Sequence, residues 1–136
     1  MPDDRFRWST AVHEAGHAIV AWGLGLSVGG LELFEADGAG RSWIEDHAHL
    51  EVVDQIAVCA AGMEAVALLD AGALLDAATL SQAGYSDHGK IIELLAARSE
   101  REHDTTRHEG HQRARALLEQ RSRPRGTWMR RHSWTS

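Results

Sequence analysis

Two histidines four residues apart, His13 and His17, enclose Glu14 in a stretch that is otherwise built mainly from small and apolar residues. Positions i and i+4 lie one above the other on a helix face, so both imidazoles can share a single metal ion if this stretch is an α-helix. The pattern therefore predicts a helix over residues 9–24. It also requires another segment of the chain to pack against that helix and complete the site.

The chemistry that suits this pattern is zinc binding. Zinc takes imidazole nitrogen at about 2.0–2.1 Å, and catalytic zinc sites use three protein ligands and a water. Glu14 follows the first histidine and can accept a proton from zinc-bound water, whose pKa falls to about 7. The alternative is an ordinary helix with incidental histidines, and nine histidines in 136 residues make a chance match less rare. Because buried polar groups cost free energy unless they are satisfied, we expect metal ligands, with Zn2+ as the metal.

A third protein ligand has to come from elsewhere in the chain. The extended metzincin motif would place glycine at position 20 and histidine at position 23, and the sequence has Val20 and Gly23 there. Glu64 lies in an apolar segment where a lone carboxylate would be costly. Asp87 follows Gly84 and is the other candidate. The residues alone leave both carboxylates open.

Periodicity along the rest of the chain predicts further helices and one hairpin. Residues 31–34 alternate as a half-buried strand does, and residues 41–44 can return as a second strand after turn-forming residues. Apolar residues then recur at intervals of three and four, and two later segments are compatible with helix. These helices are expected over residues 50–68, 87–101 and 103–120. We predict an α+β fold that is predominantly α-helical with a small β-hairpin.

Charge divides the chain into two parts. Residues 1–120 hold all 20 acidic and nine of the 14 basic residues, a net charge of −11, whereas residues 121–136 hold five arginines and no acid. We predict one domain over residues 1–120 and a basic tail over residues 121–136 that is a solvated, disordered terminus. The acidic body argues against nucleic-acid binding. A tail that contacts an acidic partner or nucleic acid is the alternative.

Cysteine content and hydropathy indicate the compartment. Cys59 is the only cysteine, so no internal disulfide can form and a reducing compartment fits. Residues 1–8 contain acids with no apolar run behind them, which is not the pattern of a signal peptide. The most apolar region, residues 52–75, is interrupted by three acidic residues, so no membrane segment is expected. We therefore predict a cytoplasmic protein.

Three segments in order resemble the FtsH-type ATP-dependent zinc metalloproteases. HEAGHAIV, residues 13–20, is similar to their zinc-binding helix, residues 60–65 resemble their small-residue motif, and residues 84–87 resemble their glycine-x-x-aspartate segment. The resemblance covers residues 8–120, the peptidase domain alone. It implies a zincin-like fold in which His13, His17 and Asp87 bind zinc and Glu14 is the general base.

The resemblance also implies an activity and partners. The expected reaction is hydrolysis of peptide bonds in unfolded or flexible protein segments by zinc-activated water. Because the sequence has no Walker motif, a separate ATPase or unfoldase is an expected partner, and a homo-oligomer is left open.

Some residues depart from the family pattern. Met63 stands where arginine is usual, and His88 stands where a hydrophobic residue is usual. Glu64 and His88 are kept as alternative ligands or as groups that support a ligand. The alternative function is a non-catalytic, zinc-stabilised interaction domain derived from such a peptidase. A further alternative is a phage-like or mobile-element protein that binds a host partner through the basic tail.

Overall fold

The computed structural model describes residues 4–33, 40–69 and 77–121. Within these ranges the chain forms four α-helices and one two-stranded antiparallel sheet, which confirms the expected α+β class with helix predominating. The elements in chain order are α1 (Asp4–Gly23), β1 (Val28–Leu33), β2 (Gly40–Ile44), α2 (Val52–Leu68), α3 (Ala77–Ala96) and α4 (Glu100–Arg121).

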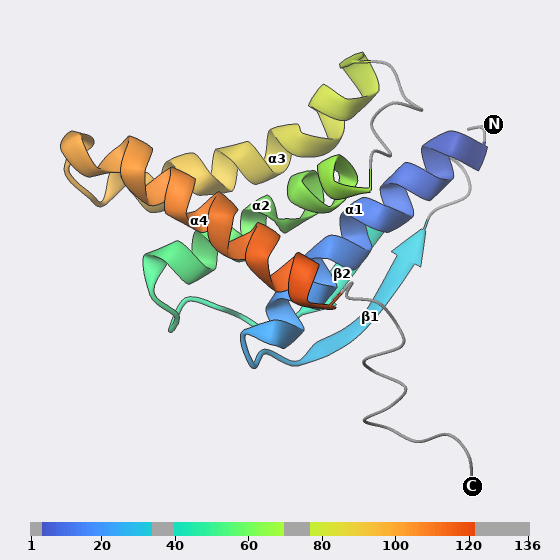
Figure 1. Cartoon of the computed structure of the whole chain (residues 1–136), viewed down its shortest axis with the longest axis horizontal. Coiled ribbons are helices and arrows are strands. Elements are labelled where there is room, and N and C mark those ends of the chain that lie inside the picture. Colours follow the sequence, from blue (N-terminus) through green and yellow to red (C-terminus); the bar gives the residue numbers. More distant parts are fainter. Residues whose placement is uncertain (1–3, 34–39, 70–76, 122–136) are drawn as a thin grey trace, which may run out of the picture.

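Helix α2 is the centre of the molecule. It contacts each of the other three helices, and the hairpin packs on α1 (Figure 1). Its sequence is apolar with few polar interruptions, as expected for a helix that is covered on several sides. Its buried alanines pack against residues of α1 and α4. The main core is formed by Val20, Ala21, Leu26, Ala57, Val58, Ala61, Ala65, Ala114, Leu117 and Leu118.

A second, smaller cluster joins α2 to α3. Ile91 and Leu95 of α3 are almost fully buried against Ile56, Cys59 and Ala60 of α2. Residues four apart lie on one helix face, so this contact also turns Asp87 of α3 toward α2. The cluster therefore fixes the rotation of α3 and with it the direction of one candidate ligand.

The hairpin carries a register irregularity near its start. Val28 pairs with Ile44 and Gly30 pairs with Trp43, so Gly29 is an extra residue on β1. Gly30 has φ +151°, a conformation that residues with side chains rarely adopt. Because side chains alternate along a strand, one extra residue moves the side chains of all later residues of β1 to the opposite face.

Several element bounds differ from the sequence prediction. Strand β1 begins at Val28 and not at residue 31, α3 ends at Ala96 and not at residue 101, and α4 begins at Glu100 and not at residue 103. The largest differences are at two helix starts. Helix α1 begins at Asp4, ahead of the expected start at residue 9. Helix α3 begins at Ala77 and not at about residue 87, so Gly84 lies inside it. A glycine inside a helix costs only about 0.5–1 kcal/mol relative to alanine, and the neighbouring alanine, leucine and glutamine residues favour helix.

The ends of α1 and α4 meet. The guanidinium of Arg121 lies 4.3 Å from the ring centroid of Trp22. Arg121 is the first residue of the predicted basic tail and the last of α4, and the rest of the tail, residues 122–136, lies outside the described residues. Phe34 and the predicted turn residues 37–39 lie outside them as well. In the part of the chain that is described, no helix is long and apolar enough to cross a membrane.

Candidate metal and catalytic site

Helix α1 places His13 and His17 on one face, one turn apart, as predicted. Both side chains are buried, with 7% and 8% of the residue exposed. Their Nε2 atoms are 3.2 Å apart, and the rings meet edge to face. The two nitrogens that could bind a metal therefore converge on one point.

Helix α2 lies close to α1 because residues at their contact have little or no side chain. A Cβ atom at Gly62 would lie 2.5 Å from an atom of the His13 ring. A Cβ at Gly16 of α1 would lie 2.6 Å from the Ala61 carbonyl oxygen and from the Cβ of Ala65. Real Cβ atoms do not approach so closely, so only glycine at these two positions allows α1 and α2 to lie this close with the His13 ring between them.

Helix α3 brings the third group. Oδ2 of Asp87 lies 2.9 Å from Nε2 of His13 and 3.2 Å from Nε2 of His17. Asp87 is 7% exposed, although it is separated from the histidines by 70 or more positions in the chain. The three residues that the sequence proposed as metal ligands thus meet at one buried point.

The hydrogen bonds of His17 determine where its proton is. Nδ1 of His17 lies 2.7 Å from the main-chain oxygen of Val58, which can only accept, so Nδ1 carries the hydrogen and donates it. In the neutral ring, Nε2 then has a lone pair, and that lone pair faces a carboxylate oxygen of Asp87. Two lone pairs this close repel each other unless a proton or another cation lies between them.

The contact between His17 and Asp87 also shifts the pKa of each group. Burial alone would lower the pKa of His17, but the Asp87 carboxylate and the Val58 carbonyl outweigh it and raise the pKa above 6.5. Burial alone would raise the pKa of Asp87, but hydrogen bonds from His13 and His17 bring it well below its usual range. The site therefore attracts positive charge.

Two nitrogens and one carboxylate oxygen fit zinc. In a tetrahedral site with bonds of about 2.0–2.1 Å, neighbouring ligand atoms are about 3.3 Å apart. The three separations here, 2.9, 3.2 and 3.2 Å, are close to that value. The bond from His17 to the Val58 carbonyl is the outer contact that metal-bound histidines usually make.

The ligand triangle is formed by Nε2 of His13, Nε2 of His17 and Oδ2 of Asp87. Glu14 stands beside this triangle, and the hairpin holds it in place. A carboxylate oxygen of Glu14 lies within 4.8 Å of the histidine nitrogens, farther than Asp87, and the side chain is half-buried. Oγ of Ser42, on β2, forms a short contact with Oε2 of Glu14 and lies 3.0 Å from the Glu14 main-chain oxygen. Glu14 is therefore close enough to His13 and His17 to share a metal ion with them, while the closer carboxylate contacts of the two histidines are with Asp87.

Glu64 and His88 lie away from this point. The carboxylate of Glu64 contacts α4, with Oε2 2.9 Å from Nδ1 of His111 and Oε1 3.5 Å from Arg115. His88 is exposed, although it follows Asp87 directly, because successive helix residues point in different directions. Glu64 thus joins α2 to α4, and of the two candidate carboxylates only Asp87 lies within hydrogen-bond distance of the two histidines.

Sequence reasoning missed several groups around the site. The Val58 carbonyl is a main-chain atom, so no residue type marks it. Ser42 depends on the strand register, which the sequence pattern did not specify. His111 lies in a polar segment, and its contact with Glu64 appears only when α4 packs on α2. The glycine at 62 was visible as part of a small-residue motif, without its contact to the His13 ring.

Cys59 is near the site but does not join it. The residue is buried in the α2–α3 cluster, as expected for a small core residue. Burial and the nearby Asp87 charge raise the pKa of the thiol to about 11. A thiolate ligand is therefore disfavoured at neutral pH.

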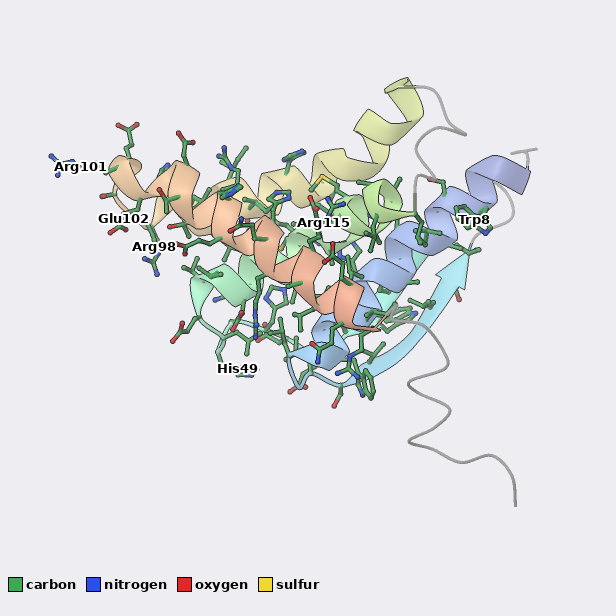
Figure 2. The ribbon with its side chains drawn as sticks, in the orientation of Figure 1. Trp8, His49, Arg98, Arg101, Glu102 and Arg115 are labelled. Carbon is green, nitrogen blue, oxygen red and sulfur yellow. The ribbon has the colours of Figure 1, made fainter. Side chains whose placement is uncertain are left out.

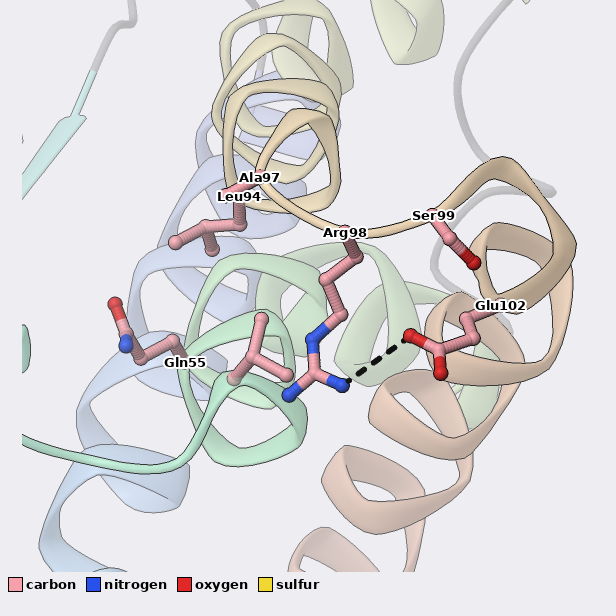
Figure 3. A pocket seen from close by; sticks show the side chains of 7 residues that line it. Gln55, Leu94, Ala97, Arg98, Ser99 and Glu102 are labelled. Atoms are coloured by element: carbon pink, nitrogen blue, oxygen red, sulfur yellow. Dashed lines mark ion pairs between the residues drawn. The ribbon is translucent and has the colours of Figure 1, made fainter.

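A separate hollow lies where α3 meets α4. It has a volume of about 570 Å³ and is crossed by an ion pair between Arg98 and Glu102 (Figure 3). Figure 2 places these charged side chains, together with Arg101, at the opposite end of the molecule from Trp8 of α1. This hollow does not include any of the candidate ligands.

Comparison with protein families, with curated proteins and with solved structures gives no match for this chain.

Proposed function

We propose that this chain is a zinc metallopeptidase of the HExxH type, with a zincin-like fold similar to the peptidase domain of the FtsH-type proteases. One observation carries the proposal. Three buried ligand atoms, from His13, His17 and Asp87, meet within 3.2 Å of one another, and a separate carboxylate stands beside them. When bound, zinc would supply a Lewis acid that lowers the pKa of water and polarises a carbonyl.

The chain's own residues divide the remaining work. His13, His17 and Asp87 would hold the metal, and the Val58 carbonyl keeps the lone pair of His17 aimed at it. Glu14 accepts a proton from the attacking water as the water oxygen bonds to the peptide carbon. Glu14 then gives that proton to the amine nitrogen as the C–N bond breaks. In this scheme Glu14 is the catalytic base and acid.

The proposed substrate is a peptide or an unfolded or flexible protein segment in the cytoplasm. Folded substrates would require an ATP-dependent unfoldase as partner, as the family resemblance implies. The alternative function is a zinc-stabilised interaction domain without catalysis. The small exposed fractions of His13, His17 and Asp87 favour that alternative, because closed metal sites are typical of structural zinc.

One experiment separates the two functions. Wild-type chain and Glu14→Gln, at equal zinc content, are incubated without ATP with fluorescently labelled, unfolded casein. We expect wild type to cleave and Glu14→Gln to lose about 10²- to 10⁴-fold in rate, since the proton acceptor is gone. The matched control is Glu109→Gln, which changes an exposed glutamate beside histidine in α4 and should cleave like wild type.

The outcomes are distinct. Equal cleavage by wild type and Glu14→Gln would remove the proposed role of Glu14. No cleavage by either, with one zinc bound to each, would favour the zinc-stabilised interaction domain.

A further inference from the structure

The hairpin delivers a hydroxyl group to the proposed catalytic glutamate. Oγ of Ser42 contacts Oε2 of Glu14 at short range and lies 3.0 Å from the Glu14 main-chain oxygen. Both side chains are half-buried, so water competes less for these bonds than on an open surface. The contact joins residues 28 positions apart, on β2 and α1.

Strand register explains why Ser42 faces α1. Leu31 pairs with Ser42 and Leu33 pairs with Gly40, so these four residues share one face of the hairpin. At Gly40 that face is in contact with α1, because a Cβ there would lie 2.9 Å from the Cγ atom of Glu14. The glycine lets the strand approach the helix closely enough for the hydroxyl of Ser42 to reach Glu14.

The chemistry of the contact restricts Glu14 in a defined way. A serine hydroxyl has one hydrogen to donate, and both Oε2 and the main-chain oxygen of Glu14 can accept it. The contact with Oε2 is the shorter of the two, and an ionised carboxylate is the stronger acceptor, so the hydrogen goes to Oε2. Donation to Oε2 holds the carboxylate in one rotamer and leaves Oε1 as the atom that can take a proton. The glutamate side chain has several rotatable bonds, so without this contact it would sample other orientations.

We propose that Ser42 is a positioning residue, which aims the carboxylate of Glu14 at the water that attacks the peptide bond. This inference rests on the proposed peptidase function. Ser42 acts through Glu14 and has no contact of its own with the ligand triangle among the bonds of the described residues. The hairpin is then part of the catalytic apparatus, although it supplies no ligand.

The kinetic test compares Ser42→Ala, Ser42→Thr and the matched control Ser27→Ala. We expect Ser42→Ala to lower kcat about 10- to 100-fold at unchanged KM and zinc content, because a misplaced catalytic group loses rate on this scale. Ser42→Thr keeps the hydroxyl and should restore most of the rate. Ser27 lies just before β1, is exposed, and uses its main-chain N–H to bond Glu45, so Ser27→Ala should behave as wild type.

A double variant tests whether Ser42 works through Glu14. In the Glu14→Gln background, Ser42→Ala should cause no further loss of residual rate, since the group that it positions is already absent. A further loss of tenfold or more would overturn the inference and give Ser42 a role independent of Glu14.

A second measurement does not depend on activity. In the metal-free chain labelled with ¹³C at glutamate side chains, the Glu14 carboxyl resonance is identified by its loss in Glu14→Gln. Ser42→Ala should shift it and Ser42→Thr should leave it near the wild-type position. An unmoved resonance, or full kcat in Ser42→Ala, overturns the inference. A moved resonance in a chain that never cleaves overturns the proposed function instead, and the positioning of a catalytic step with it.

Discussion

His17 uses its two ring nitrogens for different purposes. Nδ1 donates to the main-chain carbonyl of Val58, and Nε2 faces Asp87 and His13. The ring cannot turn without giving up its bond to α2, so the direction of the Nε2 lone pair is fixed by the fold. Zinc binding then requires little reorganisation of this side chain.

Replacement of Asp87 by asparagine tests the third ligand. The amide has nearly the same shape but no charge, so zinc affinity should fall by more than the roughly 10- to 100-fold that loss of an outer-shell partner causes. Competition with a chromophoric chelator measures this. Asp54→Asn is the matched control, because it removes a carboxylate that pairs with Arg113 at the surface, with 3.3 Å between N and O. Equal zinc affinity in Asp87→Asn and wild type would show that the metal has a different third ligand.

Helix α2 supports the site through residues that have little or no side chain. Gly62 receives the ring of His13, and Ala61 and Ala65 receive Gly16. The small-residue segment that looked like a family motif in the sequence thus has a physical purpose, which is to bring α1 close enough for its histidines to be buried.

A pair of glycine substitutions tests this packing. Gly62→Ala forces the His13 ring to move, so we expect a loss of about 1–3 kcal/mol in the free energy of unfolding and weaker zinc binding. Gly89→Ala, in α3, has nothing within 4 Å of the added Cβ and should raise stability by up to about 1 kcal/mol. Urea unfolding measures both. A Gly62→Ala variant that is as stable as Gly89→Ala would mean that α1 can shift without loss of stability.

The sequence predicted some elements better than others. The apolar repeat predicted α2 to within two residues at its start, because a covered helix has a strong periodic signal. The predicted start of α3 at residue 87 is too late, because the alanine, leucine and glutamine residues around Gly84 favour helix and the glycine does not end it.

The residues of the site also differ in how well the sequence predicted their positions. The spacing of His13 and His17 predicts their shared face, because it depends only on helix geometry. The meeting of Asp87 with them depends on how α3 rotates, and the sequence offered Glu64 as well. The contact of Ser42 with Glu14 could not be predicted. The extra residue at Gly29 decides which residues of β1 lie on the same face of the hairpin as Ser42.

At the scale of the whole molecule, zinc should stabilise the fold and do so more strongly as pH rises. The raised pKa of His17 means that its protonated form stabilises the metal-free chain below pH 6.5, and that this contribution is lost as pH rises through the raised value. Zinc needs the neutral ring, so it competes with that proton. Asp87 stays ionised across this range because its pKa is lowered.

Thermal unfolding with and without zinc measures this effect. At a fixed free zinc concentration of about 100 times the Kd at pH 6.5, the stabilisation at that pH should be about 2.7 kcal/mol. The difference in Tm between zinc-loaded and metal-free chain should widen as pH increases from 6.5 upward. A difference that is constant or narrows over this range would contradict the assignment of His17 as a ligand.

Asp87 is made long after the histidines that it meets. His13 and His17 leave the ribosome together on α1, whereas Asp87 follows His13 by 74 residues. A metal ion taken up by the nascent chain would have two ligands until α3 has been synthesised and has docked on α2. The site is therefore complete before the main core is, because Ala114, Leu117 and Leu118 of α4 follow α3 in the chain. A chain cut short before α3 would release its metal readily.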